Sequence, residues 1–79
     1  MSARYWVLVA HEVMASNPQW PGGLRPVKQA EDGPGPSPDC AWWLFEDDGA
    51  PATLDGKRVE LTFTRSGDKV MIASRTPAT

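Results

Sequence analysis

The two residue types best suited to catalysis and metal binding each occur only once in this chain. Among its 79 residues, His11 is the only histidine and Cys40 is the only cysteine. The pair His11-Glu12 is typical of a general base beside an orienting carboxylate, but neighbouring residues of a strand point to opposite faces, so Glu12 cannot orient the imidazole directly. The sequence places no serine or cysteine nucleophile beside His11. We therefore expect no catalytic residues, and a protein that is not an enzyme.

A single cysteine also limits the covalent and metal chemistry of the chain. It cannot form an intramolecular disulfide, and one histidine with one cysteine cannot supply the ligands of a structural zinc site. No basic residue flanks Cys40 to favour a reactive thiolate, so we interpret it as a small packing residue. We expect no metal and no cofactor.

The sequence contains one cluster of carboxylates, Glu46-Asp47-Asp48, which Asp55 follows. A calcium loop needs a longer set of oxygen ligands at fixed spacings, and this cluster lacks it. We interpret the cluster as an acidic turn. In this interpretation Asp48 caps a short helical turn that carries Pro51 near its start.

Four tryptophans in so short a chain indicate a binding surface. If Trp42 and Trp43 lie in one strand, they point to opposite faces, so one ring belongs to the core while the other is exposed or covered by the loop that holds Trp20. An exposed tryptophan near basic residues is typical of the residues that dominate binding. We therefore predict that Trp20, Trp42 and Trp43 contact a partner. The alternative is that the rings only supply buried area to a small core.

Charge is distributed unevenly along the chain, although the net charge is only −2. Residues 30–56 contain seven acids and no base, whereas residues 57–79 contain five bases and two acids. A basic hairpin beside an aromatic ring can bind a phosphate backbone and its bases, here through Arg58, Lys69 and Arg75. An ordinary solvated sheet, or bases paired with the acidic turn, would give the same pattern.

The C-terminal part of the sequence predicts a β-hairpin. Two runs in which apolar and polar residues alternate flank the dipeptide Gly67-Asp68. A two-residue turn there, with glycine in the first central position of a type II′ turn, sets the register of the two strands. It places Phe63 opposite Ile72 and Glu60 opposite Arg75.

Three further segments indicate regular structure. Residues 40–46 are apolar on both alternating faces, which is typical of a strand covered on both sides or of one whose aromatic face is left for a partner. Residues 5–14 predict a strand because of their valines and aromatic residues, and a helix is the alternative. Residues 48–56 predict one short helical turn that ends at Gly56.

The middle of the chain predicts a long loop. Residues 15–39 contain six of the eight prolines and several glycines, so we expect no regular element there, with disorder over residues 30–38. At the other end, we expect residues 76–79 to form a flexible tail.

Together these segments predict a mainly β fold in one small domain, residues 1–79. We expect about four strands, one short helical turn and the long Pro/Gly-rich loop, arranged as a strongly bent antiparallel sheet or a partly open barrel of SH3-like or OB-like size. The longest apolar run, residues 6–10, is far shorter than the ~20 residues of a membrane-spanning helix. We therefore expect no membrane partner and a cytoplasmic location.

The pattern of residues favours binding over catalysis. The leading hypothesis is a small non-enzymatic binding or adaptor module that acts through an aromatic protein–protein interface, with self-association into a homodimer as one form of it. The sequence does not identify the partner. The alternative is a small-barrel protein that binds nucleic acid through its basic C-terminal hairpin.

Overall fold

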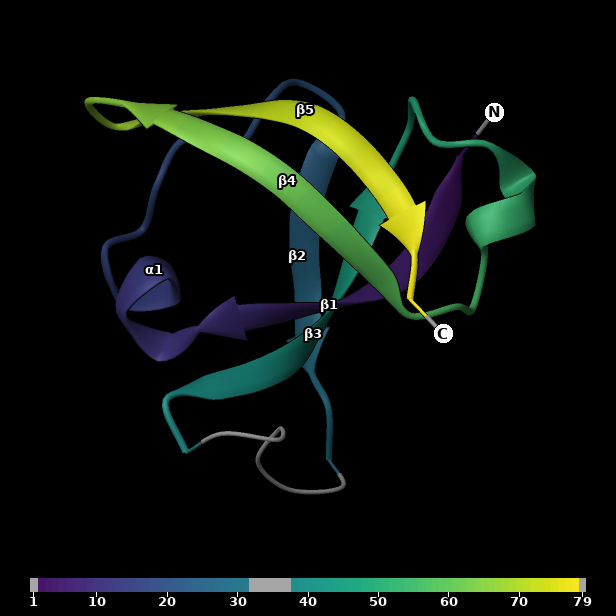
Figure 1. Ribbon diagram of the computed structural model, residues 1–79, viewed down its shortest axis with the longest axis horizontal. Coiled ribbons are helices and arrows are strands. Elements are labelled where there is room, and N and C mark those ends of the chain that lie inside the picture. The colour runs from purple at the N-terminus through teal and green to yellow at the C-terminus, as the bar shows by residue number, and fades with distance from the viewer. Residues whose placement is uncertain (1, 32–37, 79) are drawn as a thin grey trace.

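The computed structural model, which describes residues 2–31 and 38–78, contains five strands (Figure 1). They form a three-stranded antiparallel sheet with the order β1-β3-β2 and a two-stranded antiparallel sheet, β4-β5. The prediction of a mainly β protein is confirmed, but the described strands number five and form no closed barrel. In chain order the elements are β1 (Ala3–Ala10), helix α1 (His11–Ala15), β2 (Leu24–Gln29), β3 (Cys40–Asp47), the 3-10 turn η1 (Ala52–Leu54), β4 (Val59–Ser66) and β5 (Lys69–Pro77).

The β4-β5 hairpin crosses one face of the three-stranded sheet and is joined to the rest of the chain at both of its ends (Figure 1). At one end Arg58, which directly precedes β4, forms a parallel bridge with Trp6 of β1, and the Trp6 N–H donates to the carbonyl of Lys57 at 2.8 Å. At the other end Gln19 forms a bridge with Lys69 at the start of β5. These contacts enclose the core between the two sheets.

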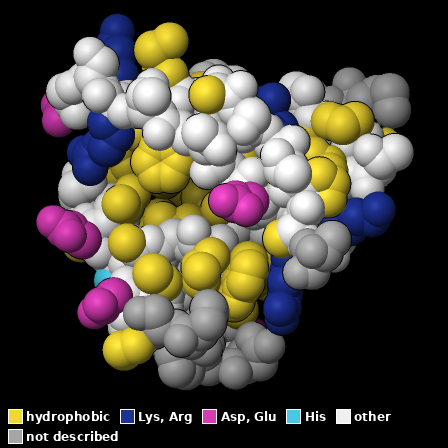
Figure 2. Space-filling model, viewed as in Figure 1, with side chains coloured by type: hydrophobic (Ala, Val, Ile, Leu, Met, Phe, Trp, Pro, Cys, Tyr) yellow, Lys and Arg dark blue, Asp and Glu magenta, His cyan; other side chains and the backbone are white. Residues whose placement is uncertain are grey.

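The core is built from the face of the three-stranded sheet that the hairpin covers. Alternate residues of β1 are buried, as the strand period of two requires, and β3 follows the same pattern. Apolar side chains are visible in a hollow beside the hairpin (Figure 2). The buried apolar residues are Ala3, Tyr5, Val7, Val9, Leu24, Ala41, Phe45, Ala50, Leu54, Val59 and Val70.

One polar residue lies in this core. Asp47 at the end of β3 is 2% exposed, and its carboxylate accepts hydrogen bonds from three groups. The Tyr5 hydroxyl donates to Oδ2 at 2.5 Å, the Arg75 Nε donates to the same oxygen at 2.5 Å, and the Gly49 N–H donates to Oδ1 at 3.0 Å. A buried carboxylate is tolerated only when it is paired and hydrogen-bonded, and this one has a partner in each of β1, β5 and the following turn.

These contacts shift the titration of all three side chains. Burial alone would raise the pKa of Asp47, but the hydrogen bonds from Tyr5, Arg75 and Gly49 favour the charged form more strongly, so its pKa lies below the ordinary value. Burial and the hydrogen bond to Asp47 raise the pKa of Tyr5. The hydrogen bond to Asp47 likewise raises the pKa of Arg75. At neutral pH the network therefore holds a neutral phenol, a carboxylate and a guanidinium.

A β-bulge brings Arg75 to this network. The predicted turn is confirmed, because Ser66 pairs with Lys69 across two residues and Gly67 has a φ of 62°. The pairing of Phe63 with Ile72 is also confirmed. The predicted pairing of Glu60 with Arg75 is wrong, because the register shifts between Thr62 and Phe63, and Arg75 pairs with Leu61. The shift turns Arg75 from the outer face of the hairpin toward the core.

The expectation that residues 15–39 lack regular structure is wrong over β2. Pro26 lies inside this strand, which a central strand would not allow. The strand is at the edge of its sheet and pairs only with β3, and its register shifts between Pro26 and Lys28. A bulged edge strand tolerates a missing N–H. The expected disorder of residues 30–38 falls mostly on residues 32–37, which lie outside the described residues.

Three smaller predictions also need correction. The N-terminal strand ends at Ala10, and the residues that follow form α1. The predicted helical turn is the 3-10 turn η1, with Gly56 at a φ of 76° after it, but Pro51 precedes it and no side chain caps it, so Asp48 is not its cap. Strand β5 runs to Pro77, so the first two residues of the expected flexible tail are strand, and the Ala78 N–H donates to the carbonyl of Arg58 at 2.8 Å.

We predict that Asp47→Asn lowers the free energy of unfolding at pH 7 by about 3 kcal/mol, because it leaves Arg75 without its carboxylate. Asp48→Asn is the matched control. It removes an exposed carboxylate one residue away whose ion pair with Arg25 spans 3.6 Å, and exposed pairs contribute at most about 1 kcal/mol. Urea unfolding followed by circular dichroism measures both. Equal losses in the two variants would contradict the role of the buried carboxylate.

The same network predicts how stability depends on pH. Because the pKa of Asp47 is depressed in the folded protein, its contribution is present above the unfolded value of about 3.9 and is lost as the pH falls through the folded value. The wild-type protein should therefore lose stability from about pH 5 downward, and its curve should converge on that of Asp47→Asn. Unfolding at a series of pH values tests this. A difference between the two proteins that is as large at pH 2 as at pH 7 would argue against it.

Candidate ligand-binding face

The outer face of the three-stranded sheet carries the side chains that alternate with the core residues. The strand registers arrange them in rows across β1, β3 and β2. A charged row thus borders two rows that are mostly apolar. The first row is Arg4, Glu46 and Arg25, the second is Trp6, Leu44 and Lys28, and the third is Leu8 and Trp42, beside which the Ala30 N–H donates to the Trp42 carbonyl.

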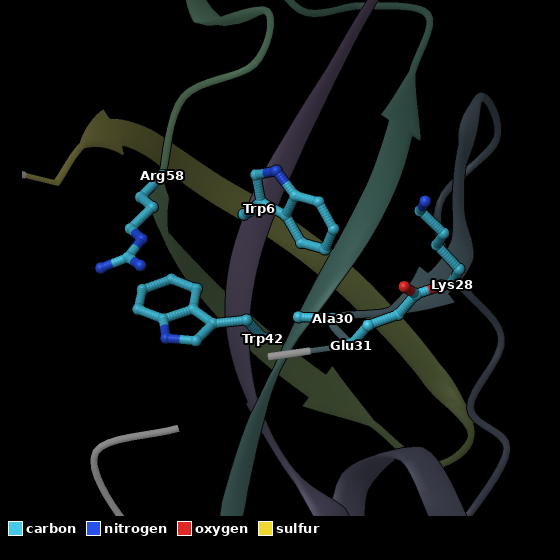
Figure 3. A pocket seen from close by; sticks show the side chains of 6 residues that line it. All are labelled: Trp6, Lys28, Ala30, Glu31, Trp42 and Arg58. Atoms are coloured by element: carbon cyan, nitrogen blue, oxygen red, sulfur yellow. The ribbon is translucent and has the colours of Figure 1, made fainter. Parts of the chain in front are cut away.

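Trp6 and Trp42 line a cavity of about 380 Å³ on this face (Figure 3). Both indoles are half-buried. Figure 3 shows Arg58 and Trp42 on one side of the Trp6 ring, with Lys28 and Glu31 on the other. The cavity therefore combines two aromatic rings with two cations and one carboxylate.

Arg58 is stacked on one of these rings. Its guanidinium carbon lies 4.8 Å from the centroid of the Trp42 ring, which is within the range of a cation–π interaction. Trp42 comes from the centre of one sheet and Arg58 from the start of the hairpin, so the stack depends on how the two sheets are joined. The bridge between Trp6 and Arg58 makes that join.

The charged row at the border is held by ion pairs. Arg4 Nε donates to Glu46 Oε2 at 2.9 Å, and Arg25 contacts the other carboxylate oxygen. The two arginine side chains are 60% and 54% exposed, so these pairs contribute little to stability. Their effect on the face is electrostatic, because two cations share one carboxylate.

A second hollow adjoins the first. Beyond the bridge between Trp6 and Arg58, residues of β1 and β4 line a groove of about 360 Å³ that Trp42 also lines. Leu8, on its outer side, is 37% exposed. The remaining lining residues are Val7, Val59, Glu60, Leu61 and Ala78, so the groove is mainly apolar.

The structure separates the three tryptophans that the sequence assigned to a partner. Only Trp42 lies on the outer face. Trp20 packs edge-on against Phe45, with ring centroids 5.0 Å apart, and Trp43 packs against the same core. The buried Trp43 Nε1 has no hydrogen-bond partner among the described residues, and the ring packs there through its apolar area.

The three basic residues that were predicted to contact nucleic acid are also separated. Arg58 lines the cavity beside Trp6, whereas Lys69 is at the hairpin turn and lines a different hollow, next to Trp20. Arg75 is engaged by Asp47. The structure therefore brings one of the three to the outer face.

Sequence reasoning missed Trp6 and Lys28 as residues of this face. Strand alternation contained the signal for Trp6, because Trp6 and Leu8 must share the face opposite to Tyr5 and Val7. Lys28 was hidden, because its place depends on the unpredicted strand β2 and on the bulge within it.

The two residues that the sequence singled out for chemistry lie at the starts of two elements. His11 is exposed at the start of α1, and Cys40 is a half-buried free thiol at the start of β3. Within residues 2–31 and 38–78, no group of three or more histidine, cysteine or acidic side chains could hold a metal ion. Neither helix of this described part has the length and apolar composition to cross a membrane.

Comparison with protein-family models, with curated proteins and with solved structures finds no match to this chain.

We predict that the two adjacent tryptophans differ in their contribution to stability. Trp43→Ala removes a ring packed against the core and should lower the free energy of unfolding by about 3 kcal/mol or more. Trp42→Ala removes a ring from the outer face and should leave a folded protein with a smaller loss. Urea unfolding and one-dimensional NMR of the two variants test this. Loss of folding in both would contradict the assignment of Trp42 to a binding surface.

Proposed function

We propose that this chain is a small non-enzymatic binding module of the cytoplasm, and that it binds a protein partner through the outer face of its three-stranded sheet. The observation that supports this most directly is the half-buried Trp42 ring, stacked by Arg58 beside Trp6, in the cavity on the outer sheet face (Figure 3). Tryptophan and arginine are the residue types most enriched among those that dominate binding energy. Trp42 is the proposed anchor.

The composition of the face supports a protein as the partner. Its centre is apolar, with Leu44 between Lys28 and Trp6 in the second row, and its border is the charged row of Arg4, Glu46 and Arg25. Protein interfaces commonly have such an apolar centre and a polar rim. The cavity beside Trp42 has room for a side chain of the partner.

The charge of the face bears on self-association. Its cations exceed its carboxylates by one, because Glu31, Glu46 and Asp48 stand against Arg4, Arg25, Lys28 and Arg58. In a two-fold symmetric dimer through this face, the same excess of positive charge would lie on both sides of the interface. We therefore propose that the main partner is a different protein, and that a homodimer is the second form of the same interaction. Sedimentation equilibrium over a range of protein concentrations distinguishes the two.

Selection from a phage-displayed library of random peptides tests the proposal without a known partner. The wild-type chain should enrich peptides, and Trp42→Ala should lose at least tenfold in affinity for them while it remains folded. Met71→Ala is the matched control, because Met71 is 63% exposed on the hairpin, away from the outer face. No enrichment, or equal binding by the Trp42 and control variants, would count against the proposal.

Single-stranded nucleic acid is the second candidate. Arg58 and Lys28 beside two indole rings are a combination that can hold phosphates and stack bases. This candidate predicts that a fluorescent oligothymidylate binds at low salt, that its affinity falls steeply as salt is added, and that Trp42→Ala abolishes the binding. Fluorescence anisotropy measures all three. Unchanged anisotropy at 20 mM salt would remove the candidate.

A further inference from the structure

Arg58 differs from the other arginines that the structure places in contacts. Arg4, Arg25 and Arg75 each form an ion pair with a carboxylate. Within the described residues, Arg58 has no such partner, and its recorded side-chain contact is the face of the Trp42 ring. It is an exposed guanidinium in an ordered position whose charge no carboxylate of the described chain neutralises.

The backbone fixes the position of this guanidinium. Arg58 forms the bridge with Trp6, and its carbonyl accepts a hydrogen bond of 2.8 Å from the Ala78 N–H. The preceding residue, Lys57, accepts the Trp6 N–H at 2.8 Å. Contacts with β1 and with the end of β5 therefore hold the root of the side chain, and the Trp42 ring supports its far end. Less conformational freedom then remains to be lost on binding.

A stacked guanidinium still has free hydrogen-bonding capacity. The contact with Trp42 uses the flat face of the group, whereas its five N–H donors lie in the plane and point outward from its edge. Two parallel donors of this kind match the two oxygens of a carboxylate. Because no carboxylate of the described chain occupies this edge, we propose that Arg58, supported by Trp42, is the receptor for a carboxylate of an acidic, extended segment of the protein partner. This inference rests on the proposed function.

The surroundings of Arg58 favour a carboxylate of a peptide over a strand of phosphates. Glu31 lines the same cavity and the chain has a net charge of −2, so a polyanion meets more repulsion here than one carboxylate does. On the other side of Trp42 lies the apolar groove between β1 and β4, lined by Leu8 and Leu61. An extended segment with an acidic residue near an apolar one would place the first at Arg58 and the second in this groove.

An array of extended peptides tests this inference. Each peptide is synthesised twice, once with aspartate or glutamate and once with asparagine or glutamine at the same positions. The wild-type chain should bind the acidic versions about tenfold to hundredfold more tightly, since a hydrogen bond to a charged group contributes about 1.5–3 kcal/mol. Arg58→Gln should abolish this preference. Arg58→Lys should reduce it, because lysine keeps the charge but has neither the planar stack nor the paired donors.

Arg65→Gln is the matched control, because Arg65 is a second exposed arginine of the hairpin and its loss changes the net charge by the same amount. This variant should keep the preference for acidic peptides. A preference that survives in Arg58→Gln, or that Arg65→Gln also loses, would overturn the assignment of Arg58 while leaving Trp42 as a binding anchor. If no peptide binds, both the inference and the proposed function fail. If oligothymidylate binds, and only its affinity depends on Arg58, the anion is a phosphate and the carboxylate assignment is wrong.

Discussion

The fold depends on the burial of one carboxylate. Asp47 ends the central strand of the larger sheet, and its two oxygens bind Tyr5 on β1, Arg75 on β5 and the backbone of the turn at Gly49. A carboxylate removed from water is costly unless each of its oxygens is satisfied, so this residue specifies how the hairpin lies against the sheet. A single β-bulge shifts the register by one residue from the predicted pairing and so places Arg75 there. The side chains of the outer face are positioned by the three-stranded sheet, which the contacts of Asp47 help to stabilise.

The central strand β3 serves both sides of the molecule at once. Its neighbours Trp42 and Trp43 point to opposite faces, so the same pair of residues supplies a ring to the core and a ring to the candidate binding surface. A protein of this size has little interior, and large aromatic side chains supply much of its buried area. With the hairpin on one face only, the other face is left for Trp6, Trp42 and the charged row. That division accounts for the four tryptophans of so short a chain.

The two faces of the three-stranded sheet also differ in how their charged side chains are paired. On the core side, the buried Asp47 carboxylate is paired with the Arg75 guanidinium and accepts hydrogen bonds from Tyr5 and Gly49. Outside, two arginines share Glu46, and Arg58 rests on an aromatic ring with no acidic partner in the described chain. The low net charge of the chain therefore conceals one guanidinium on this face that no carboxylate of the described residues pairs. The proposal of an acidic ligand rests on this guanidinium.

Local sequence by itself determined the elements whose causes are local. Alternating apolar residues and a glycine at a position of positive φ specified the hairpin and its turn, and the apolar residues before Asp47 specified a strand with two opposed tryptophans. Tertiary structure decided what depends on neighbours distant in the chain. Three features depend on such neighbours, and the local sequence does not predict them. They are the bulge that turns Arg75 inward, the edge position that allows Pro26 in a strand, and the contact of Arg58 with Trp42. Hydrogen bonding and packing between sheets override local preference at these positions, because an unpaired buried charge or an uncovered ring costs more free energy than a shifted register.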